Sequence, residues 1–399
     1  MKIESLKIEG YKSLMNTSLQ QLAKLNMLYG YNNSGKSNIL KFIELVFTAK
    51  TSTGLSGMDS SNFWDGIIEN ASFFFNAKKN NDKISFQFKF KVTKSAIKDV
   101  LSPELYDEIV KTYFVGNNHD EIPLEIYGSL NKLNFYAAQI KLINVKINSQ
   151  EFYSVDEGGN HVYLEFVTNE TSKVLSENKF EVFQLIMNIF TNCVVLLDND
   201  RYFDKEKPEF VKFDEISPRK FKRWLYTLSI NPETHPIYQK LIEFIDKFKV
   251  AQKNNKALNE CETNSPFNKH VLSFAQSQDE LLIMFESNGR RLPISNFGTG
   301  IQQILYILAK IFSSNSKIIL IEEIELNLSP KYQAEILKHL KQFIDENKIS
   351  QVFFTTHSRY FNFRNDFSIY EVKIDALGET TGTKVAAAKK SFFTIRNLE

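Results

Sequence analysis

The sequence predicts an α/β fold of the P-loop type, assembled from segments at both ends of the chain. Residues 30–37 spell G-x-x-x-x-G-K-S between an apolar strand pattern and a helical pattern. Much later, the apolar run Lys317–Ile321 ends in Glu322 and Glu323, and a second apolar run precedes His357. Because polar groups at the carboxyl ends of parallel strands share one edge of a sheet, these motifs predict a single phosphate-handling site.

Composition limits the class of protein. The 399 residues are 43% hydrophobic, which is enough for a sizeable core in one large or two smaller domains. A formal net charge of +2 gives no overall electrostatic footprint for nucleic acid, although it does not exclude a local basic patch. Cys193 and Cys261 lie far apart without metal-ligand spacing, so both are expected to be ordinary thiols of a reducing compartment.

The N-terminus alternates polar and apolar residues as a strand does, and it lacks the features of a signal peptide. No apolar run reaches the roughly 18 residues that a membrane-spanning helix needs. We therefore expect a cytoplasmic protein with no membrane partner.

Hydrophobic periodicity predicts regular elements at both ends of the chain. A hairpin with arms Ser72–Asn76 and Ile84–Val92 is also expected, because a polar turn separates two strand-like runs. The other expected strands are Ile3–Ile8, Leu25–Tyr29, Val271–Ala275, Leu281–Glu286, Lys317–Glu322 and Gln351–Thr355, and the expected helices are Lys36–Ala49, Gly300–Phe312 and Pro330–Glu346.

The middle of the chain is less regular. Pro103–Phe114 and Arg219–Val250 are helix-like, Leu133–Asn148 is strand-like, and the polar residues from 253 to 264 are typical of a loop. The expected parts are therefore residues 1–95, the N-terminal part of the P-loop domain; 96–270, an α-rich insertion that binds a partner or a trigger; and 271–399, the C-terminal part of the P-loop domain.

The glycine-rich loop has the residues that phosphate binding needs. Gly30 and Gly35 allow the backbone to fold around a phosphate with N–H groups pointing inward, and the following helix adds its N-terminal dipole. Lys36 is expected to reach the β- and γ-phosphates of ATP, and the Ser37 hydroxyl to complete a Mg²⁺ shell. The remaining candidate ATP-binding residues of this segment are Asn32, Asn33, Ser34 and Asn38.

The acidic pair and the histidine are candidates for the chemistry itself. Glu322 is placed to hold Mg²⁺, and Glu323 to orient and deprotonate the attacking water, because phosphoryl transfer needs positioning and charge stabilisation more than covalent chemistry. His357 follows the next apolar strand, from where it could hydrogen-bond the γ-phosphate or the water. The alternatives are two solvated acids at a helix cap and a structural histidine.

A second glycine-containing segment opens a later helix. Ser295, Gly298, Thr299 and Gly300 combine hydroxyl groups, glycines and a helix N-terminus, which together make an anion site. Because one phosphate loop is already present, this segment suggests a γ-phosphate clamp offered to a partner subunit. A plain N-cap turn is the alternative.

These motifs resemble the ATPase heads of the ABC superfamily. More narrowly, they are similar to the soluble branch that contains SMC, RecF and the overcoming-lysogenization-defect (OLD) family ATPases. The segments that carry the resemblance are Ile3–Leu14 for the first strand and its turn, Gly35–Asn38 for the phosphate loop, Gly298–Gln303 for the signature, Leu320–Pro330 for the double-glutamate block and Thr355–Ser358 for the switch histidine.

The resemblance implies an ABC-type ATPase head with a mixed β-sheet lobe, interrupted by the α-rich insertion. Two heads would stack head to tail, with each ATP held between one Lys36 loop and the other subunit's Gly298 segment. Two positions depart from the pattern: Glu322 replaces the Asp usual in ABC heads, and Ile324 stands where Pro is common. The family's glutamine loop cannot be placed, and Gln87 and Gln139 are weak candidates.

The resemblance also implies a role. The stretch after His357 is too short for the Toprim nuclease domain of OLD proteins, so a nuclease or toxin would be a separate protein. The Asp198-Asn199-Asp200 segment follows the apolar run Cys193–Leu197, and the two are interpreted as a core strand followed by Arg201; a metal site is the alternative. Among OLD-like proteins, the chain most resembles the ATPase subunits of Septu, PARIS or retron-linked anti-phage systems.

Three alternatives stay open: a RecF-like DNA-repair ATPase, a slow ATP-bound scaffold that sequesters a toxin, and a transporter ATPase. Nucleic acid is a further candidate partner, because Arg219–Trp224 mixes cations with aromatic residues. The alternative for that cluster is a solvated helix face that buries Phe221 and Trp224. Arg290 and Arg291 could touch phosphate or form a salt bridge at a hairpin turn.

Overall fold

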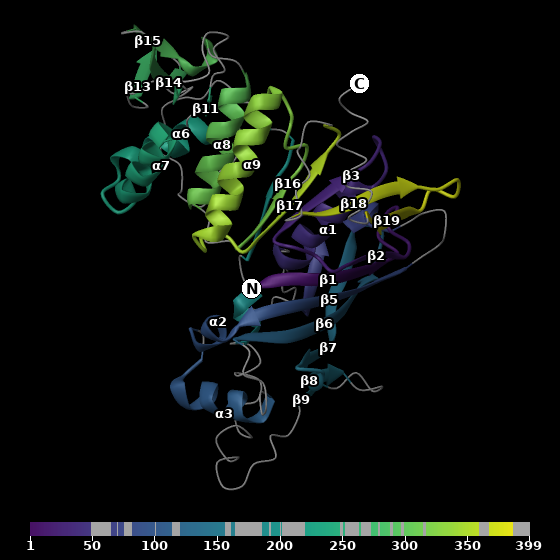
Figure 1. Ribbon diagram of the computed structural model, residues 1–399. Helices are drawn as coiled ribbons and strands as arrows, with labels where there is room; N and C mark the ends of the chain where they lie inside the picture. The colour runs from purple at the N-terminus through teal and green to yellow at the C-terminus, as the bar shows by residue number, and fades with distance from the viewer. Residues whose placement is uncertain are drawn as a thin grey trace.

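The computed structural model describes residues 1–48, 65–69, 71–75, 82–99, 101–113, 120–155, 161–163, 186–190, 193–199, 201, 220–247, 250–251, 263–264, 273–277, 280–287, 290–296, 299–313, 317–358 and 367–385. In these residues the chain forms an antiparallel sheet, a largely parallel sheet and helices around them (Figure 1).

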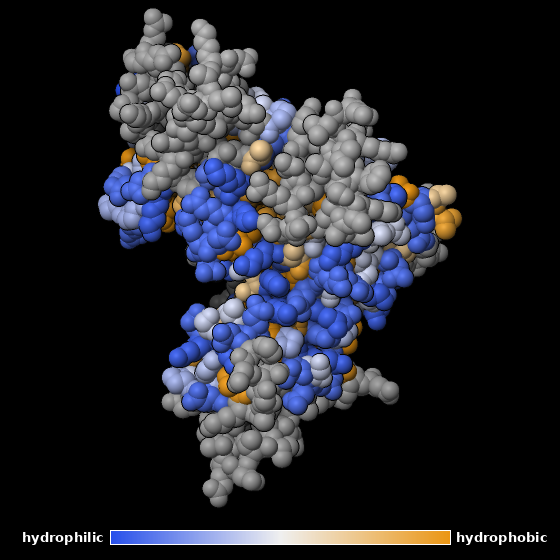
Figure 2. Space-filling model, in the orientation of Figure 1, coloured by the Kyte–Doolittle hydropathy of each residue, from blue (hydrophilic) through white to orange (hydrophobic). Residues whose placement is uncertain are grey.

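The antiparallel sheet has the order β2-β1-β5-β6-β7-β8-β9, and β4 pairs with β7. Buried and more exposed residues alternate along β5, where Ile84, Phe86, Phe88, Phe90 and Val92 point into the core. Its outer face over β1, β5 and β6 is largely hydrophilic (Figure 2). The strands are β1 (Lys2–Glu9), β2 (Thr17–Gln20), β4 (Asp65–Glu69), β5 (Lys83–Thr93), β6 (Glu121–Lys132), β7 (Ala137–Ile147), β8 (Gln150–Val155) and β9 (His161–Tyr163).

The second sheet has the order β10-β16-β17-β3-β18-β19, in which every neighbouring pair except β18–β19 is parallel. Strand β16 is buried at every position, because helices or the other sheet cover both faces of a parallel sheet. The strands are β3 (Leu25–Tyr29), β10 (Val194–Leu197), β16 (Ile318–Ile321), β17 (Gln351–Thr356), β18 (Phe367–Ile374) and β19 (Thr380–Lys384).

Two hydrophobic cores lie on opposite faces of the parallel sheet. Helix α1 (Lys36–Thr48) fills the core between the two sheets, and Phe42 packs there against Tyr11 and Phe86. The other core is covered by helices that lie to the left of β16 and β17 in Figure 1, away from α1. These are α6 (Phe221–Ile230), α7 (His235–Lys247), α8 (Thr299–Ser313) and α9 (Pro330–Asp345).

Smaller elements complete the described chain. Helices α2 and α3 follow β5, and a three-stranded antiparallel sheet precedes α8. The bounds are α2 (Lys94–Lys98), α3 (Pro103–Tyr113), β11 (Val250–Ala251), β12 (Thr263–Asn264), β13 (Ser273–Ser277), β14 (Glu280–Ser287), β15 (Arg290–Pro293) and the 3₁₀ turns η1 (Ala71–Phe73), η3 (Asn188–Phe190) and η5 (Ile294–Asn296).

The hairpin expected between residues 72 and 92 is wrong. Ala71–Phe73 is a 3₁₀ turn, and β5 instead pairs with β1 and β6, which are distant in sequence. The single helix expected at Arg219–Val250 is also interrupted, because residues 231–234 form a turn between α6 and α7. Proline 236 then stands in the first turn of α7, where its missing N–H needs no partner.

Residues 96–270, expected as an α-rich insertion, contribute strands to both sheets. Strands β6, β7 and β8 extend the sheet begun by β1 and β5, and β10 pairs with β16. The boundary expected at residue 95 therefore falls between two hydrogen-bonded strands of one sheet.

Candidate functional site

The glycine-rich loop joins β3 to α1 and depends on its two glycines for packing. A Cβ atom on Gly30 would lie 2.1 Å from the carbonyl oxygen of Val372, and one on Gly35 would lie 2.2 Å from Oγ1 of Thr380. Gly35 also has a φ of +94°, a conformation that side-chain-bearing residues rarely adopt. The loop is thus pressed against β18 and β19.

Lys36 is the buried cation of this loop. Its Nζ donates to the carbonyl oxygens of Gly30 at 2.9 Å and Tyr31 at 2.7 Å, which holds the ammonium inside the turn. Burial lowers the pKa of Lys36, and the charges of Glu323 and Glu325 act in the opposite direction. The phosphate loop and the acidic segment after β16 therefore share one electrostatic environment.

A polar cluster under the loop was not predicted from the sequence. The Thr380 hydroxyl of β19 lies 3.0 Å from the carbonyl oxygen of Ser34 and 2.8 Å from Ser13 Oγ. Asn38 Nδ2 donates to the same Ser13 Oγ at 3.0 Å. Thr380, which is 1% exposed, and the turn after β1 thus brace the loop through these contacts.

Thr380→Val tests this brace. The variant keeps the side-chain volume but removes the hydroxyl beside Ser34, and the loss of such a buried partner costs about 1–3 kcal/mol. We expect ATP to bind roughly 5- to 100-fold more weakly, measured by calorimetry with Mg²⁺. Thr383→Val, at an exposed position three residues further along the same strand and outside this contact, is the matched control. Equal affinities of Thr380→Val and wild type would show that the brace does not shape the loop.

Glu322 is the buried carboxylate at the end of β16. It is 2% exposed, its backbone N–H donates to the carbonyl of Leu197 at 2.8 Å, and Oε1 lies 3.6 Å from Lys41 Nζ. Among the described residues, no donor is within hydrogen-bonding distance of Oε1. A buried carboxylate oxygen without a hydrogen bond fits a Mg²⁺ ligand.

The donor set around Glu322 is small. The described residues hold no group of three or more His, Cys, Asp and Glu side chains suited to a metal ion. Ser37 is the second residue of α1, the helix that also carries Lys41. One carboxylate and one hydroxyl suit Mg²⁺, which binds through few protein ligands and takes the rest from substrate phosphates and water.

Glu323 has an unusual backbone conformation, which two hydrogen bonds stabilise. Its φ is +43°, in the left-handed region, and its N–H donates to Thr355 Oγ1 at 2.8 Å. Its carbonyl oxygen accepts from Arg201 Nη2 at 3.2 Å. The candidate base therefore stands on a turn fixed by β17 on one side and by the segment after β10 on the other.

His357 follows β17 and meets the same turn. Its backbone N–H donates to Oε1 of Glu325 at 2.6 Å, so the ends of β16 and β17 are joined directly. Glu325, Thr355 and Arg201 were missed by sequence reasoning. Their signal was limited to proximity in the sequence: Glu325 lies two residues after Glu323, Thr355 two residues before His357, and Arg201 a few residues after an apolar strand.

The second glycine-containing segment lies at the start of α8. Ser295 is in η5 and exposed, Thr299 begins α8, and Gly298 is outside the described residues. A Cβ on Gly300 would lie 2.6 Å from the carbonyl oxygen of Asn327, so this glycine allows α8 to approach the loop after β16.

The glutamine candidates do not lie at the end of a strand next to β16. Gln87 is within β5 and donates to Tyr127 Oη at 2.8 Å, and Gln139 is within β7. The strand next to β16 is β10, as expected for Cys193–Leu197, and Asp198 follows it. Asp200 lies outside the described residues.

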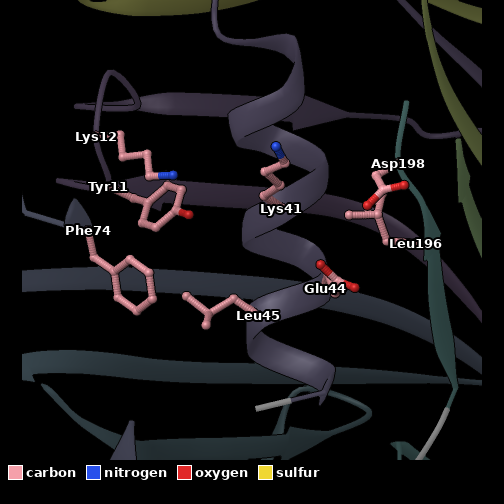
Figure 3. Close-up of a pocket in the computed structure, with 8 residues that line it drawn as sticks. All are labelled: Tyr11, Lys12, Lys41, Glu44, Leu45, Phe74, Leu196 and Asp198. Atoms are coloured by element: carbon pink, nitrogen blue, oxygen red, sulfur yellow. The ribbon is translucent and has the colours of Figure 1, made fainter. Parts of the chain in front are cut away.

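A polar pocket of about 370 Å³ opens beside α1 (Figure 3). Lys41 and Glu44 project from α1 between Lys12 on one side and Asp198 on the other. Burial, followed by the charges of Asp198 and Glu322, raises the pKa of Glu44 to about 7. Burial lowers the pKa of Lys310 to about 8. Glu322 therefore belongs to a group of acidic and lysine side chains around α1 whose charges influence one another.

Described residues of both basic clusters make contacts within the fold. Phe221 and Trp224 are buried, as the helix-face alternative expects, whereas Lys222 is buried rather than solvated and pairs through Nζ with Glu280 Oε1 at 2.7 Å. Arg291 donates to Ser273 Oγ across the small sheet. The aromatic residues of the first cluster are thus unavailable for stacking on bases.

A glycine-rich loop between β3 and α1, with carboxylates at the end of the parallel strand β16, defines a P-loop ATPase fold. The family model described as AAA ATPase domain matches residues 1–361, and the chain belongs to this family of ATPases.

Two curated proteins are similar to the chain in sequence. The chain is 25% identical over 370 residues to an ATP/GTP phosphatase of Helicobacter pylori, covering 90% of this chain and 86% of the relative. It is 34% identical over 137 residues to an uncharacterized protein of Methanocaldococcus jannaschii, of which that match spans 16%.

Among solved structures, an SMC head bound to the C-terminal winged-helix domain of ScpA has a TM-score of 0.46 at 16% identity, with 98% of this chain and 100% of that chain covered. The SMC head domain of Thermotoga maritima has a TM-score of 0.41 at 13% identity, with coverages of 97% and 100%.

Within the described part of the chain, no helix combines the length and the apolar character that a membrane span requires.

Proposed function

We propose that this ATPase is a Mg²⁺-dependent, ABC-type enzyme that dimerises around ATP and switches a separate effector, a nuclease or a toxin, in anti-phage defence. The observation that carries the enzymatic part is the buried Glu322 carboxylate, whose Oε1 accepts no hydrogen bond from the described residues, beside the helix that begins with Lys36 and Ser37. The similarity to an ATP/GTP phosphatase supports hydrolysis. The defence role rests on the motif resemblance to OLD-like ATPases.

In this proposal, each residue has a separate task. Lys36 exchanges its carbonyl partners for phosphate oxygens, and the N–H groups of the loop from Gly30 to Asn38 surround the phosphate chain. Ser37 and Glu322 hold Mg²⁺, which neutralises charge on the phosphates. Glu323 orients the attacking water and accepts its proton, and His357 senses the γ-phosphate.

The second site element acts in trans. Ser295, Gly298, Thr299 and Gly300 complete the ATP site of a second copy, because a helix N-terminus with hydroxyl groups binds anions. ATP then joins two copies, and hydrolysis releases them. Residues of the 96–270 segment bind the trigger or the effector.

An affinity capture from the native host tests the role. The bait is Glu323→Gln with ATP and Mg²⁺, and the control bait is Lys36→Ala, which cannot hold ATP. We expect mass spectrometry to identify a nuclease or toxin only with the first bait. Capture of only DNA and replication proteins would contradict the defence role and support a DNA-repair ATPase. Capture of a toxin together with undetectable wild-type turnover would support an ATP-bound scaffold instead.

A further inference from the structure

Arg201 is a fully buried arginine directly behind the acidic pair. It has 0% exposure and follows β10, the strand beside β16. Its Nε donates to the carbonyl oxygen of Asp198 at 2.5 Å, and Nη2 donates to the carbonyl oxygens of Glu322 and, at 3.2 Å, Glu323. One guanidinium therefore joins the end of β10 to the backbone of both glutamates.

Burial of this charge has a desolvation cost that nearby negative charges offset only in part. Burial lowers the pKa of Arg201 to about 10, and the charge of Asp198 acts most strongly in the opposite direction. A rigid, planar guanidinium can bridge several acceptors in one plane, which the single nitrogen of a lysine cannot do.

The Glu323 peptide is the part of the site that needs such support. A left-handed φ of +43° is unfavourable for a residue with a side chain, and it persists only where neighbouring contacts determine it. Thr355 Oγ1 accepts from the N–H of Glu323 at 2.8 Å, and Arg201 donates to its carbonyl. Thr355 lies in β17 and Arg201 follows β10, the two strands on either side of β16, and the two contacts fix the direction in which the Glu323 side chain leaves the backbone.

We propose that Arg201 is a positioning residue for ATP hydrolysis: it holds the Glu322–Glu323 backbone so that the Glu323 carboxylate keeps its orientation toward the attacking water. Arg201 touches neither the metal nor the water in this role. The inference rests on the proposed function, because it requires Glu323 to act as the base. It extends that function by assigning a task to the segment after β10.

Arg201→Lys is the first test, since it keeps the charge but loses the bridge between carbonyls. Misplacement of a reacting group by about 1 Å can cost about 100-fold in rate. We therefore expect kcat to fall roughly 10- to 100-fold while KM for ATP changes less than about threefold. Arg201→Met, which is apolar and of similar length, should show the same pattern. Thermal unfolding of both variants verifies that they are folded.

A double-mutant cycle with Glu323→Gln separates positioning from other roles. If Arg201 acts through Glu323, either Arg201 variant should leave the residual single-turnover rate of Glu323→Gln unchanged within about twofold. A further loss equal to that seen in wild type would overturn the inference while leaving Glu323 as the base. Wild-type turnover by Glu323→Gln would instead overturn the base assignment and the inference with it. A wild-type kcat in folded Arg201→Lys and Arg201→Met would also overturn the inference.

Discussion

Glu323→Gln is expected to stop ATP turnover while ATP binding is retained. The amide has the shape of the carboxylate but cannot accept a proton, and general-base catalysis contributes about 10²–10⁴-fold to a rate. The backbone contacts from Thr355 and Arg201 involve no atom that the substitution changes. We expect kcat to fall by that factor in single-turnover hydrolysis, and native mass spectrometry to show a dimer that retains ATP.

Glu325→Gln is the matched control for this experiment. Glu325 lies two residues further on, and its Oε1 accepts from the His357 backbone at 2.6 Å, a hydrogen bond that an amide oxygen can preserve. Turnover should therefore fall only a few-fold, as for the loss of one modest hydrogen bond. The reverse result, an active Glu323→Gln and an inactive Glu325→Gln, would show that Glu325 is the base.

Lys36→Ala is expected to abolish ATP binding at millimolar concentrations and, with it, hydrolysis. The lysine is 5% exposed and held by the carbonyls of Gly30 and Tyr31, so its ammonium is already inside the loop that the phosphates would enter. Each hydrogen bond from a charged group is worth about 1.5–3 kcal/mol, and loss of contacts to two phosphates would weaken binding by roughly 10²–10⁴-fold. Calorimetry with a slowly hydrolysed ATP analogue measures this loss.

Lys7→Ala controls for the removal of one positive charge. Lys7 lies on β1 of the antiparallel sheet and pairs at 2.5 Å with Glu9, with 45% of its side chain exposed. An exposed pair of this kind contributes little, so ATP affinity and turnover should match wild type. If Lys36→Ala bound ATP as tightly as Lys7→Ala, the loop would not be the nucleotide site.

Features that depend on neighbouring residues could be predicted from the sequence. The strand Leu25–Tyr29 and the start of α1 at Lys36 were confirmed, because the apolar run, the glycines and the helical stripe are adjacent in the chain. Strands β16 and β17 were also predictable, since a strand covered on both faces requires a continuous apolar run. The residue types in the loop and at the end of β16 by themselves indicated phosphate and metal chemistry.

The contacts between distant segments could not be predicted in this way. The alternation of apolar and polar residues along β5 predicts a strand but does not identify its partners β1 and β6. The sequence-based expectation therefore paired β5 with the nearest strand-like run, Ser72–Asn76. The same limit applied to β19, which places Thr380 under the phosphate loop, because its contribution depends on where the sheet places it.

By itself, the sequence determined a P-loop ATPase with a lysine, a serine and a pair of glutamates in the order that nucleotide chemistry requires. Only the tertiary structure decided that Oε1 of Glu322 is buried without a hydrogen bond from the described residues, that Glu323 stands on a left-handed turn and that Arg201 and Thr355 hold this turn from two sides. The physical reason is that periodicity reports how a segment meets water or a core. The register and order of parallel strands, set by packing among residues far apart in the chain, determine which polar groups meet.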